Sequence, residues 1–311
     1  MGTQATFRNF LVPLDGSHLA ESVLPLVERL AAAFAGKVRL LHIMEQHAPS
    51  TIHGERHLTS GTEADDYLTT AAARLRTLGI TVEIHVHGAK EGDVARSIVE
   101  HTQELDSDIV VLCTHGKGGL REFLFGSIAQ QVLQRGTRPI LLIPPSVAKQ
   151  PSVVTLRRLL VPLDGTPAHE QALPAAAAIA QSCKAVMHLV LVIPTLTTLS
   201  GERAVPGLLL PMTMTAILDL AQQGGAEYLE RIAATYRADG VSVMAEVARG
   251  DPVPTVLDLA DRHAADLIVM ASHGRAGIEA LLSGSVAPRI AGRTGHPLLL
   301  LHAVEAAHDP R

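Results

Sequence analysis

Hydrophobic positions along the chain follow two alternating spacings. Short unbroken apolar runs are typical of strands buried on both faces, and they alternate with segments in which apolar residues recur every three to four positions, as in amphipathic helices. In the first half the predicted strands cover 10–14, 38–44, 80–87, 109–113 and 140–143, and the predicted helices cover 19–34, 64–78, 94–105 and 128–134. This alternation predicts an α/β domain with a five-stranded, doubly wound, parallel sheet of the Rossmann-like kind.

The second half repeats the first in the same order. RNFLVPLDGS returns as RRLLVPLDGT, SDIVVLCTHG returns as ADLIVMASHG, and RPILLIPP returns as HPLLLLHA. Three matches in one order indicate a tandem duplication of the α/β domain. The Pro- and Ser-containing stretch PPSVAKQPS at 144–152 is a plausible linker. We therefore expect two domains, at residues 1–147 and 153–311.

Composition and charge exclude several classes of function. Apolar residues make up 47% and charged residues 18% of 311 residues, which suits two globular domains. The net charge of −5, the absence of Trp and the 3% aromatic content argue against nucleic-acid binding. Apolar runs are shorter than the roughly 18 residues of a membrane helix. With two distant cysteines and no signal-peptide layout, we expect a cytoplasmic protein without membrane contact.

One loop is repeated at matching places. THGKGGLREFLFGS at 114–127 and SHGRAGIEALLSGS at 272–285 each have His-Gly, nine residues, then Gly-Ser. Each loop joins the end of a predicted strand to the start of a helix. Glycine exposes backbone N–H groups, and a helix N-terminus adds partial positive charge, so the loop is a candidate phosphate cradle. A structural loop kept by duplication is the alternative.

These motifs carry a family resemblance. The two VPLDG strand ends, DIVVLCTHG and DLIVMASHG, and the repeated loop resemble those of the universal stress proteins, in a tandem form that covers nearly all of both halves. Nucleotide-binding members of that family carry Gly-x-x-Gly, nine residues, then Gly-Ser or Gly-Thr, and hold a triphosphate there. The resemblance implies two domains of the adenine nucleotide alpha hydrolase-like fold that bind ATP, ADP or AMP, with Mg²⁺ as an optional companion.

The resemblance also implies which residues form the binding sites. The phosphates would lie at Gly116, Gly126 and Ser127 in the first half, and at Gly274, Gly284 and Ser285 in the second. The adenosine would lie near Pro13 and Asp15, with Ile43 flanking the adenine, and in the second half near Pro162, Asp164 and Leu191. The sequence departs from the family motif at its first glycine, which is replaced by Cys113 and Ala271. The larger cysteine would crowd the site.

Two further features have a structural explanation beside the functional one. Asp15 and Asp164 each follow a strand in Leu-Asp-Gly, where an Asx turn explains the residue as well as an acceptor for adenine or ribose does. Gly92-Asp93 and Gly250-Asp251 open a predicted helix, where Asp is typical of a helix cap. The backbone of this turn also belongs to nucleotide sites of the family.

The histidines raise the question of a metal site. His85 and His87 share one face of a predicted strand, and a second group lies between His42 and His57. Neither group has a nearby cysteine or a duplicated carboxylate, and we align Ala245 and Val247 of the second half with the first pair. The sequence therefore predicts no metal site. It also offers no catalytic set, because a nucleophile elbow, paired carboxylates and a Walker lysine are all missing.

The resemblance implies a tandem universal stress protein whose two domains form a pseudo-dimer, with 140–143 pairing with 298–301 inside one chain. We expect an adenine nucleotide to control contact with an unknown protein partner, and a homodimer of the chain is a further expectation. A nucleotide-independent scaffold and a slow ATPase are the alternatives. The segment 196–215 is an insertion of the second half, for which a lid, a contact surface and a mobile loop are the alternatives, the mobile loop being preferred.

Overall fold

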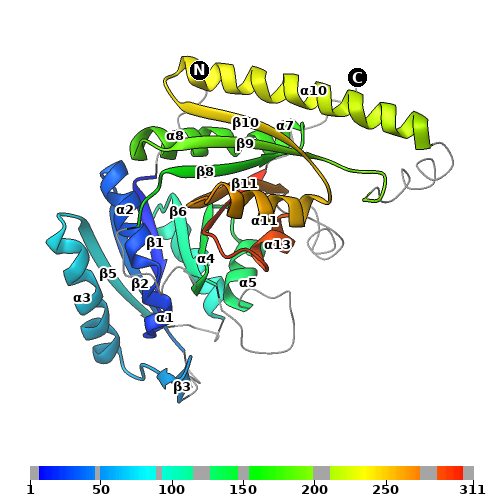
Figure 1. Ribbon diagram of the computed structural model, residues 1–311. Helices are drawn as coiled ribbons and strands as arrows, with labels where there is room; N and C mark the ends of the chain where they lie inside the picture. The colour runs from blue at the N-terminus through cyan, green and yellow to red at the C-terminus, as the bar shows by residue number, and fades with distance from the viewer. Residues whose placement is uncertain are drawn as a thin grey trace, which may run out of the picture.

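The computed structural model describes residues 7–45, 50–88, 93–114, 127–145, 154–198, 211–273 and 286–303. A ten-stranded sheet runs through both repeats in the order β10-β9-β8-β11-β12-β7-β6-β1-β2-β5 (Figure 1). The first repeat supplies β1 (Asn9–Pro13), β2 (Lys37–Met44), β5 (Thr81–Gly88), β6 (Ile109–Cys113) and β7 (Ile140–Ile143). The second supplies β8 (Arg158–Leu163), β9 (Val186–Ile193), β10 (Ser242–Arg249), β11 (Leu267–His273) and β12 (Leu298–Ala303).

Each half of the sheet is parallel and doubly wound, as predicted. In the first repeat the strand order reverses between β1 and β6, and these two strands pair with each other in parallel. The two halves join where β12 pairs antiparallel with β7, with Leu298 opposite Leu142 and Leu300 opposite Ile140. The predicted pairing of these last strands is confirmed, and it makes one sheet out of two.

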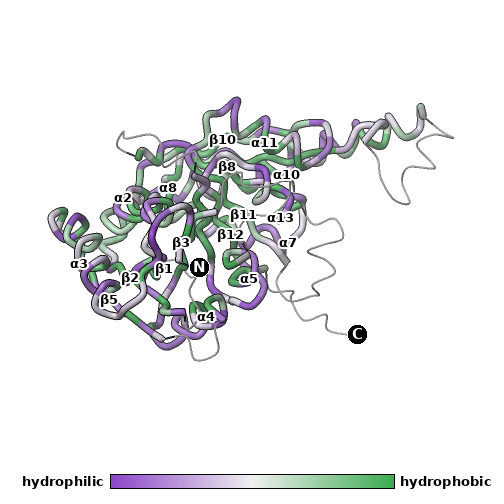
Figure 2. The backbone as a smooth tube through the Cα atoms, turned by 90° about the horizontal axis from the view of Figure 1, so that it is seen from below, coloured by the Kyte–Doolittle hydropathy of each residue, from purple (hydrophilic) through white to green (hydrophobic). Residues whose placement is uncertain are grey.

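Helices cover both faces of the sheet. One face carries α1 (His18–Glu21), α2 (Leu24–Phe34), α3 (Gly61–Thr77), α7 (Pro167–Glu170), α8 (Leu173–Cys183) and α10 (Pro211–Ala238). The other carries α4 (Val94–Glu104), α5 (Ser127–Arg135), α11 (Pro252–Arg262) and α13 (Val286–Ala291). Figure 2 shows hydrophobic residues concentrated along the central strands β8, β11 and β12. Within the described residues, no helix is long and apolar enough to cross a bilayer.

Two local features differ from the predicted elements. The helix predicted over 19–34 is divided into α1 and α2, because Pro25 lies in the first turn of α2 and has no N–H to continue a helix through this point. A small hairpin of β3 (Thr51–Ile52) and β4 (Glu55–Arg56) was not predicted. Strands of two residues leave no periodic pattern in a sequence.

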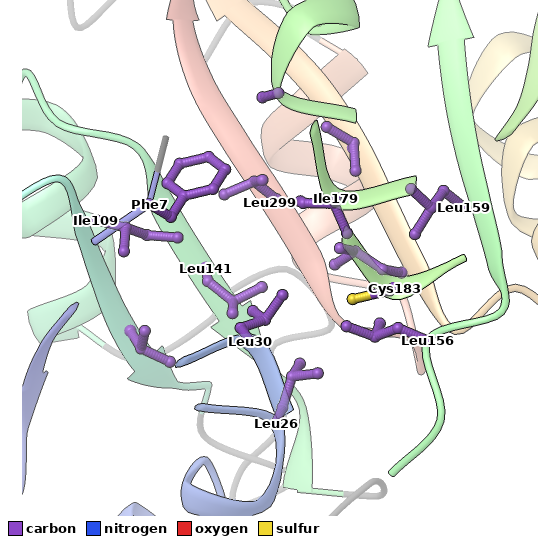
Figure 3. Close-up of a cluster of buried hydrophobic side chains, with 14 of the residues drawn as sticks. Phe7, Leu26, Leu30, Ile109, Leu141, Leu156, Leu159, Ile179, Cys183 and Leu299 are labelled. Atoms are coloured by element: carbon purple, nitrogen blue, oxygen red, sulfur yellow. The ribbon is translucent and has the colours of Figure 1, made fainter. Parts of the chain in front are cut away.

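The core on the α2 side is shared by the two repeats. Helices α2 and α8 lie in contact, and Leu26 and Leu30 of the first repeat join Ile179 and Cys183 of the second in one buried cluster (Figure 3). The alanines of α8 are buried on almost every side; they are Ala175, Ala176, Ala177, Ala178 and Ala180. Small side chains let the helix lie close to its neighbours, so the alanine run serves packing as well as helix propensity.

Candidate nucleotide site

A pocket opens at the carboxyl end of the first-repeat sheet, in the crevice between β1 and β6. This is the point where the strand order reverses, which is where open α/β sheets bind ligands. The pocket is lined by the ends of β1, β2 and β6 and by the first turns of α4 and α5; among its residues are Pro13, Asp15, His42, Ile43, Cys113 and Ile128. The structure thus brings together Pro13, Asp15 and Ile43, the three first-half residues predicted to surround the adenosine.

Asp15 makes the Asx turn that its sequence position predicts. The backbone N–H and the hydroxyl of Ser17 donate to its Oδ1, at 2.9 and 2.6 Å. Its Oδ2 lies 3.4 Å from Nε2 of His53, on the β3–β4 hairpin. Oδ1 of Asp15 is therefore engaged in the turn. Oδ2 has only the longer, 3.4 Å contact with His53. A turn and an acceptor role are compatible in this side chain.

His42, which lines the pocket, has an unpaired buried acceptor. The ring is 1% exposed, and its Nδ1 lies 2.7 Å from the carbonyl oxygen of Leu14. A carbonyl only accepts, so Nδ1 carries the hydrogen and Nε2 presents a lone pair. Nε2 is buried and has no hydrogen-bond partner among the described residues. Burial, followed by the charge of nearby His57, lowers the pKa of His42, so the ring is neutral at pH 7.

The hairpin closes one side of the pocket. His53 of this hairpin and His57 just after it both line the pocket, and His57 is 2% exposed. The following Leu58 packs on the turn after β1: a Cβ on Gly16 would lie 2.9 Å from Cγ of Leu58, and the φ of Gly16 is +94°. Glycine is therefore required at this turn. His42, His53 and His57 were visible in the sequence, but only their placement around the pocket gives them a role.

Most of the predicted phosphate residues lie outside the described residues. These are Gly116, Gly126, Gly274, Gly284 and Ser285. Ser127 is the first residue of α5, as predicted for the residue at the end of the loop. The next two residues, Ile128 and Ala129, line the pocket. The N-terminal turn of α5 therefore lies beside the adenosine candidates, which is where the resemblance implies the phosphates.

The predicted helix caps are confirmed at both repeats. Oδ1 of Asp93 accepts from the backbone N–H of Arg96 at 3.0 Å, and Oδ1 of Asp251 accepts from that of Val253 at 3.2 Å. Gly250 has a φ of +151°, and a Cβ there would lie 2.4 Å from Oγ1 of Thr255. The turn therefore requires glycine at this position, independently of any role in ligand binding. Gly92 lies outside the described residues.

The corresponding crevice of the second repeat differs in detail. Pro162 is buried near the end of β8, and Asp164 accepts from the backbone and hydroxyl of Thr166, at 2.9 and 2.7 Å. The other oxygen of Asp164 lies 2.8 Å from Nδ1 of His169. Burial raises the pKa of Asp164, but the hydrogen bonds from His169 and Thr166 outweigh it and lower the pKa to about 2. Both oxygens of Asp164 are therefore engaged.

The strand register corrects the equivalence of Ile43 and Leu191. Pro13 pairs with Leu41, and Pro162 pairs with Val190. Counting on from these pairs, Leu191 corresponds to His42, and Ile43 corresponds to Val192. Leu191 packs in the core on the α10 side of the sheet, whereas Ile43 packs in the core on the α4 side. The two residues predicted to flank the adenine are thus not equivalent.

A model of the universal stress protein family matches residues 6–144 and again residues 155–302. The chain belongs to this family. The structure contains both matched regions as halves of one sheet, so the chain is a tandem member with an α/β fold.

Sequence relatives of this universal stress protein are distant. It is 27% identical over 145 residues to universal stress protein MJ0531 of Methanocaldococcus jannaschii, which covers 47% of this chain and 81% of the relative. It is 26% identical over 226 residues to a universal stress protein of Mycolicibacterium smegmatis, covering 72% of this chain and 70% of the relative.

Solved structures support the tandem fold. A universal stress protein from Archaeoglobus fulgidus DSM 4304 superposes with a TM-score of 0.68 at 16% identity, covering 97% of this chain and 99% of the other. A universal stress protein solved in complex with cAMP matches 45% of this chain at 18% identity, with a TM-score of 0.36. That relative binds an adenine nucleotide.

The universal stress protein motif is altered at the strand end that faces the pocket. Cys113 lines the pocket, and the hydroxyl of Ser22 donates to its Sγ at 3.5 Å. Burial raises the pKa of the Cys113 thiol, so it is a neutral side chain rather than a thiolate. Ala271 is fully buried. Neither residue is among the described non-glycine positions with positive φ, so the backbone accepts a side chain at both.

Proposed function

We propose that this universal stress protein binds ATP or another adenine nucleotide in the first-repeat pocket. The observation that carries the proposal is the convergence of Pro13, Asp15 and Ile43 on one pocket at the reversal of strand order, beside the first turn of α5. A crevice of this kind is the usual ligand position in doubly wound sheets, and a helix N-terminus favours phosphate. The cAMP complex of a relative supports the same ligand class.

The chemistry of the pocket suits an adenine nucleoside. Nε2 of His42 is a buried acceptor without a donor among the described residues, and the exocyclic amino group of adenine is a donor. Oδ2 of Asp15 accepts from hydroxyl groups, as ribose requires. Pro13 and Ile43 offer apolar surface to the flat faces of a base. The phosphates then extend toward α5 and the loop that ends in Gly126 and Ser127, with Mg²⁺ as an optional companion.

We expect the second repeat to bind the nucleotide more weakly. Leu191 replaces His42 and offers no acceptor, and both oxygens of Asp164 are already held by Thr166 and His169. Binding there would have to break the contact between Asp164 and His169. The expected stoichiometry is therefore one tight site per chain.

Occupancy of the pocket would control contact with a protein partner in the stress response. A scaffold that works without nucleotide is the second candidate, and one observation favours it. The N-terminal half of α10 exposes large apolar side chains: Met212 is 87%, Leu220 68% and Ile217 50% exposed. Part of the predicted insertion, 211–215, begins this helix, and its exposed apolar residues suit a contact surface rather than a lid.

The first experiment is calorimetric titration of ATP into the purified chain, with and without Mg²⁺, after extraction of any nucleotide that copurifies. We expect one site, weakened on the order of tenfold or more by His42→Leu, because one hydrogen bond to a base contributes about that much to discrimination. Since the second repeat has leucine at this position, the variant is structurally acceptable. His188→Leu is the matched control, because His188 lies on β9 and lines no part of the first-repeat pocket.

The loops are tested in the same assay. Gly126→Ala should abolish the tight site, and Gly284→Ala should leave it unchanged. Absence of binding at millimolar ATP, with no copurified nucleotide, would refute the proposal and favour the scaffold. Phosphate release measured on the same samples tests the slow ATPase, and gel filtration with light scattering tests the homodimer.

A further inference from the structure

A cluster of three histidines lies at the edge of the sheet, between β5 and α4. Strand β5 is the last strand of the first repeat's half of the sheet (Figure 1). His85 pairs with Leu41 and His87 with Ile43, so both histidines lie on the same face of the sheet as those two residues. That face is covered by α4, which carries His101. Two histidines of the cluster therefore come from strand β5 and the third comes from helix α4. The spacing of His85 and His87 along the strand does not predict that His101 joins them.

The three imidazoles lie close enough to share one ion. One ring nitrogen from each of His85, His87 and His101 lies within 4.8 Å of the others. The ring centroids are 6.1 Å apart for His85 and His87, 5.1 Å for His85 and His101, and 4.5 Å for His87 and His101. Around a tetrahedral zinc ion with Zn–N bonds of about 2.0–2.1 Å, nitrogens lie about 3.3 Å apart. Small side-chain rotations therefore bring the three nitrogens to ligand distance.

His101 is already oriented as a metal ligand would be. Its Nδ1 lies 2.7 Å from the carbonyl oxygen of Ser97, so Nδ1 carries the hydrogen and Nε2 presents its lone pair. The ring is 2% exposed, and Nε2 is buried without a hydrogen-bond partner among the described residues. A histidine that donates one ring nitrogen to a backbone carbonyl and offers the other to the ion is the usual arrangement at metal sites.

The charges around the cluster also favour a cation. Glu104, one turn from His101 on the same helix, has its Oε2 at 3.8 Å from Nε2 of His101. The nearby arginines are already paired, Arg96 with Glu100 and Arg135 with Asp93.

We propose that His85, His87 and His101 bind one divalent transition-metal ion of the zinc class, with Glu104 or water as the fourth ligand. Imidazole nitrogen selects such an ion over Mg²⁺ or Ca²⁺, which prefer oxygen. The ion joins the edge strand β5 to α4. Helix α4 also contributes Val94 and Ile98 to the nucleotide pocket, so the ion fixes an element that the pocket uses. The proposal does not depend on nucleotide binding.

The second repeat provides an internal comparison. The register places Thr81 and Ser242 at equivalent positions, so His85 corresponds to Glu246 and His87 to Ala248. These are one residue beyond Ala245 and Val247, the positions aligned from sequence. His101 corresponds to Leu259, counted from the equivalent caps Asp93 and Asp251. None of the three equivalent positions in the second repeat is a histidine, and the imidazoles near them are His263, paired with Glu246, and His188. The three-histidine set is therefore not repeated, which predicts one ion per chain.

The test uses the untagged full-length chain without nucleotide. Zn²⁺ is titrated against a competing chelator dye, and Co²⁺ is used as a spectroscopic probe, because four-coordinate cobalt absorbs strongly in the visible range. We expect one Zn²⁺ per chain, a raised melting temperature with Zn²⁺, and a loss of affinity on the order of 100-fold in His85→Gln and His101→Gln. His188→Gln, in the second-repeat pair with His263, should bind Zn²⁺ as the wild type does.

Two results would overturn the proposal. One is the absence of stoichiometric Zn²⁺ or Co²⁺ binding at micromolar free ion. The other is binding that survives in both His85→Gln and His101→Gln, which would place the ion elsewhere. If the buried His101 variant fails to fold, His85→Gln and His87→Gln decide the question, since both residues lie on the edge strand and are less buried than His101.

Discussion

The shared core predicts that the two repeats unfold together. Leu30 on α2 is 2% exposed and packs in the cluster that contains Ile179 and Cys183 of the second repeat (Figure 3). Leu30→Ala removes the buried side chain beyond Cβ and leaves a cavity that rigid neighbours fill only in part. Lost transfer free energy and the cavity together cost about 3 kcal/mol in the free energy of unfolding.

The expected change in melting temperature follows from the loss of free energy of unfolding and the size of the chain. Unfolding entropy is about 2.1 cal/mol/K per residue, so 311 residues give about 0.65 kcal/mol/K. A loss of about 3 kcal/mol then lowers the melting temperature by about 5 °C. The continuous sheet through β7 and β12 and the α2–α8 contact make both repeats lose this stability together.

The assay is differential scanning calorimetry, with urea unfolding followed by far-ultraviolet circular dichroism. Leu220→Ala is the control, because Leu220 is 68% exposed on α10 and its loss should cost less than about 0.5 kcal/mol. We expect one transition that shifts as a whole. Two separate transitions, with Leu30→Ala moving one and leaving the other in place, would show that the repeats are independent folding units and that the shared core contributes little.

Three further predictions concern single positions. Cys113→Gly restores the motif glycine beside the pocket and should tighten ATP binding several-fold in calorimetry. Ala271→Gly, the control, should leave the affinity of the tight site unchanged. If Cys113→Gly binds ATP with the affinity of the wild type, the thiol does not crowd the ligand. Because the pKa of Asp164 is lowered from 3.8 to about 2, its contribution is present above about pH 4 and is lost as pH falls toward 2. Because solvent screens this half-exposed carboxylate, Asp164→Asn should lower the free energy of unfolding in urea by only about 1 kcal/mol at pH 6 and by almost nothing at pH 2. A difference that does not change with pH would contradict this. Gly250→Ala, at a φ of +151°, should destabilise the protein by about 1–3 kcal/mol, whereas Gly224→Ala, in an open helical position, should stabilise it slightly; equal effects in urea would refute the backbone argument.

The elements and the repeat were predictable because they depend on short-range patterns. The strands at 109–113 and 140–143 are unbroken apolar runs, and they match β6 and β7 residue for residue. The caps at Asp93 and Asp251 were predictable because a cap depends on neighbours two or three residues away. Errors arose where register mattered. The equivalence of Ile43 with Leu191, and the alignment of His85 with Ala245, were each wrong by one residue, and one residue moves a side chain to the other face of a strand.

The candidate site also has a part that could be predicted from the sequence and a part that could not. The motif residues Pro13, Asp15 and Ile43 could be chosen from the sequence through the family resemblance, and the structure places them together in one pocket. The unpaired Nε2 of His42 could not be foreseen, because it depends on the carbonyl of Leu14, which lies 28 residues away along the chain. Hydrogen-bond satisfaction is a property of the folded neighbourhood, and sequence spacing does not reveal it.

Local patterning in this chain is sufficient for its fold class, because hydrophobic periodicity and turn chemistry act over a few residues. The duplication was visible in the repeated motifs, and the family in the resemblance of those motifs to the universal stress proteins. Three features depend on contacts between distant segments. The first is the joining of two sheets through β7 and β12 into one core. The second is the enclosure of a pocket by the β3–β4 hairpin. The third is the meeting of His101 on α4 with His85 and His87 on β5. In each case the segments lie far apart along the chain, so these features exist only once the tertiary structure brings them together.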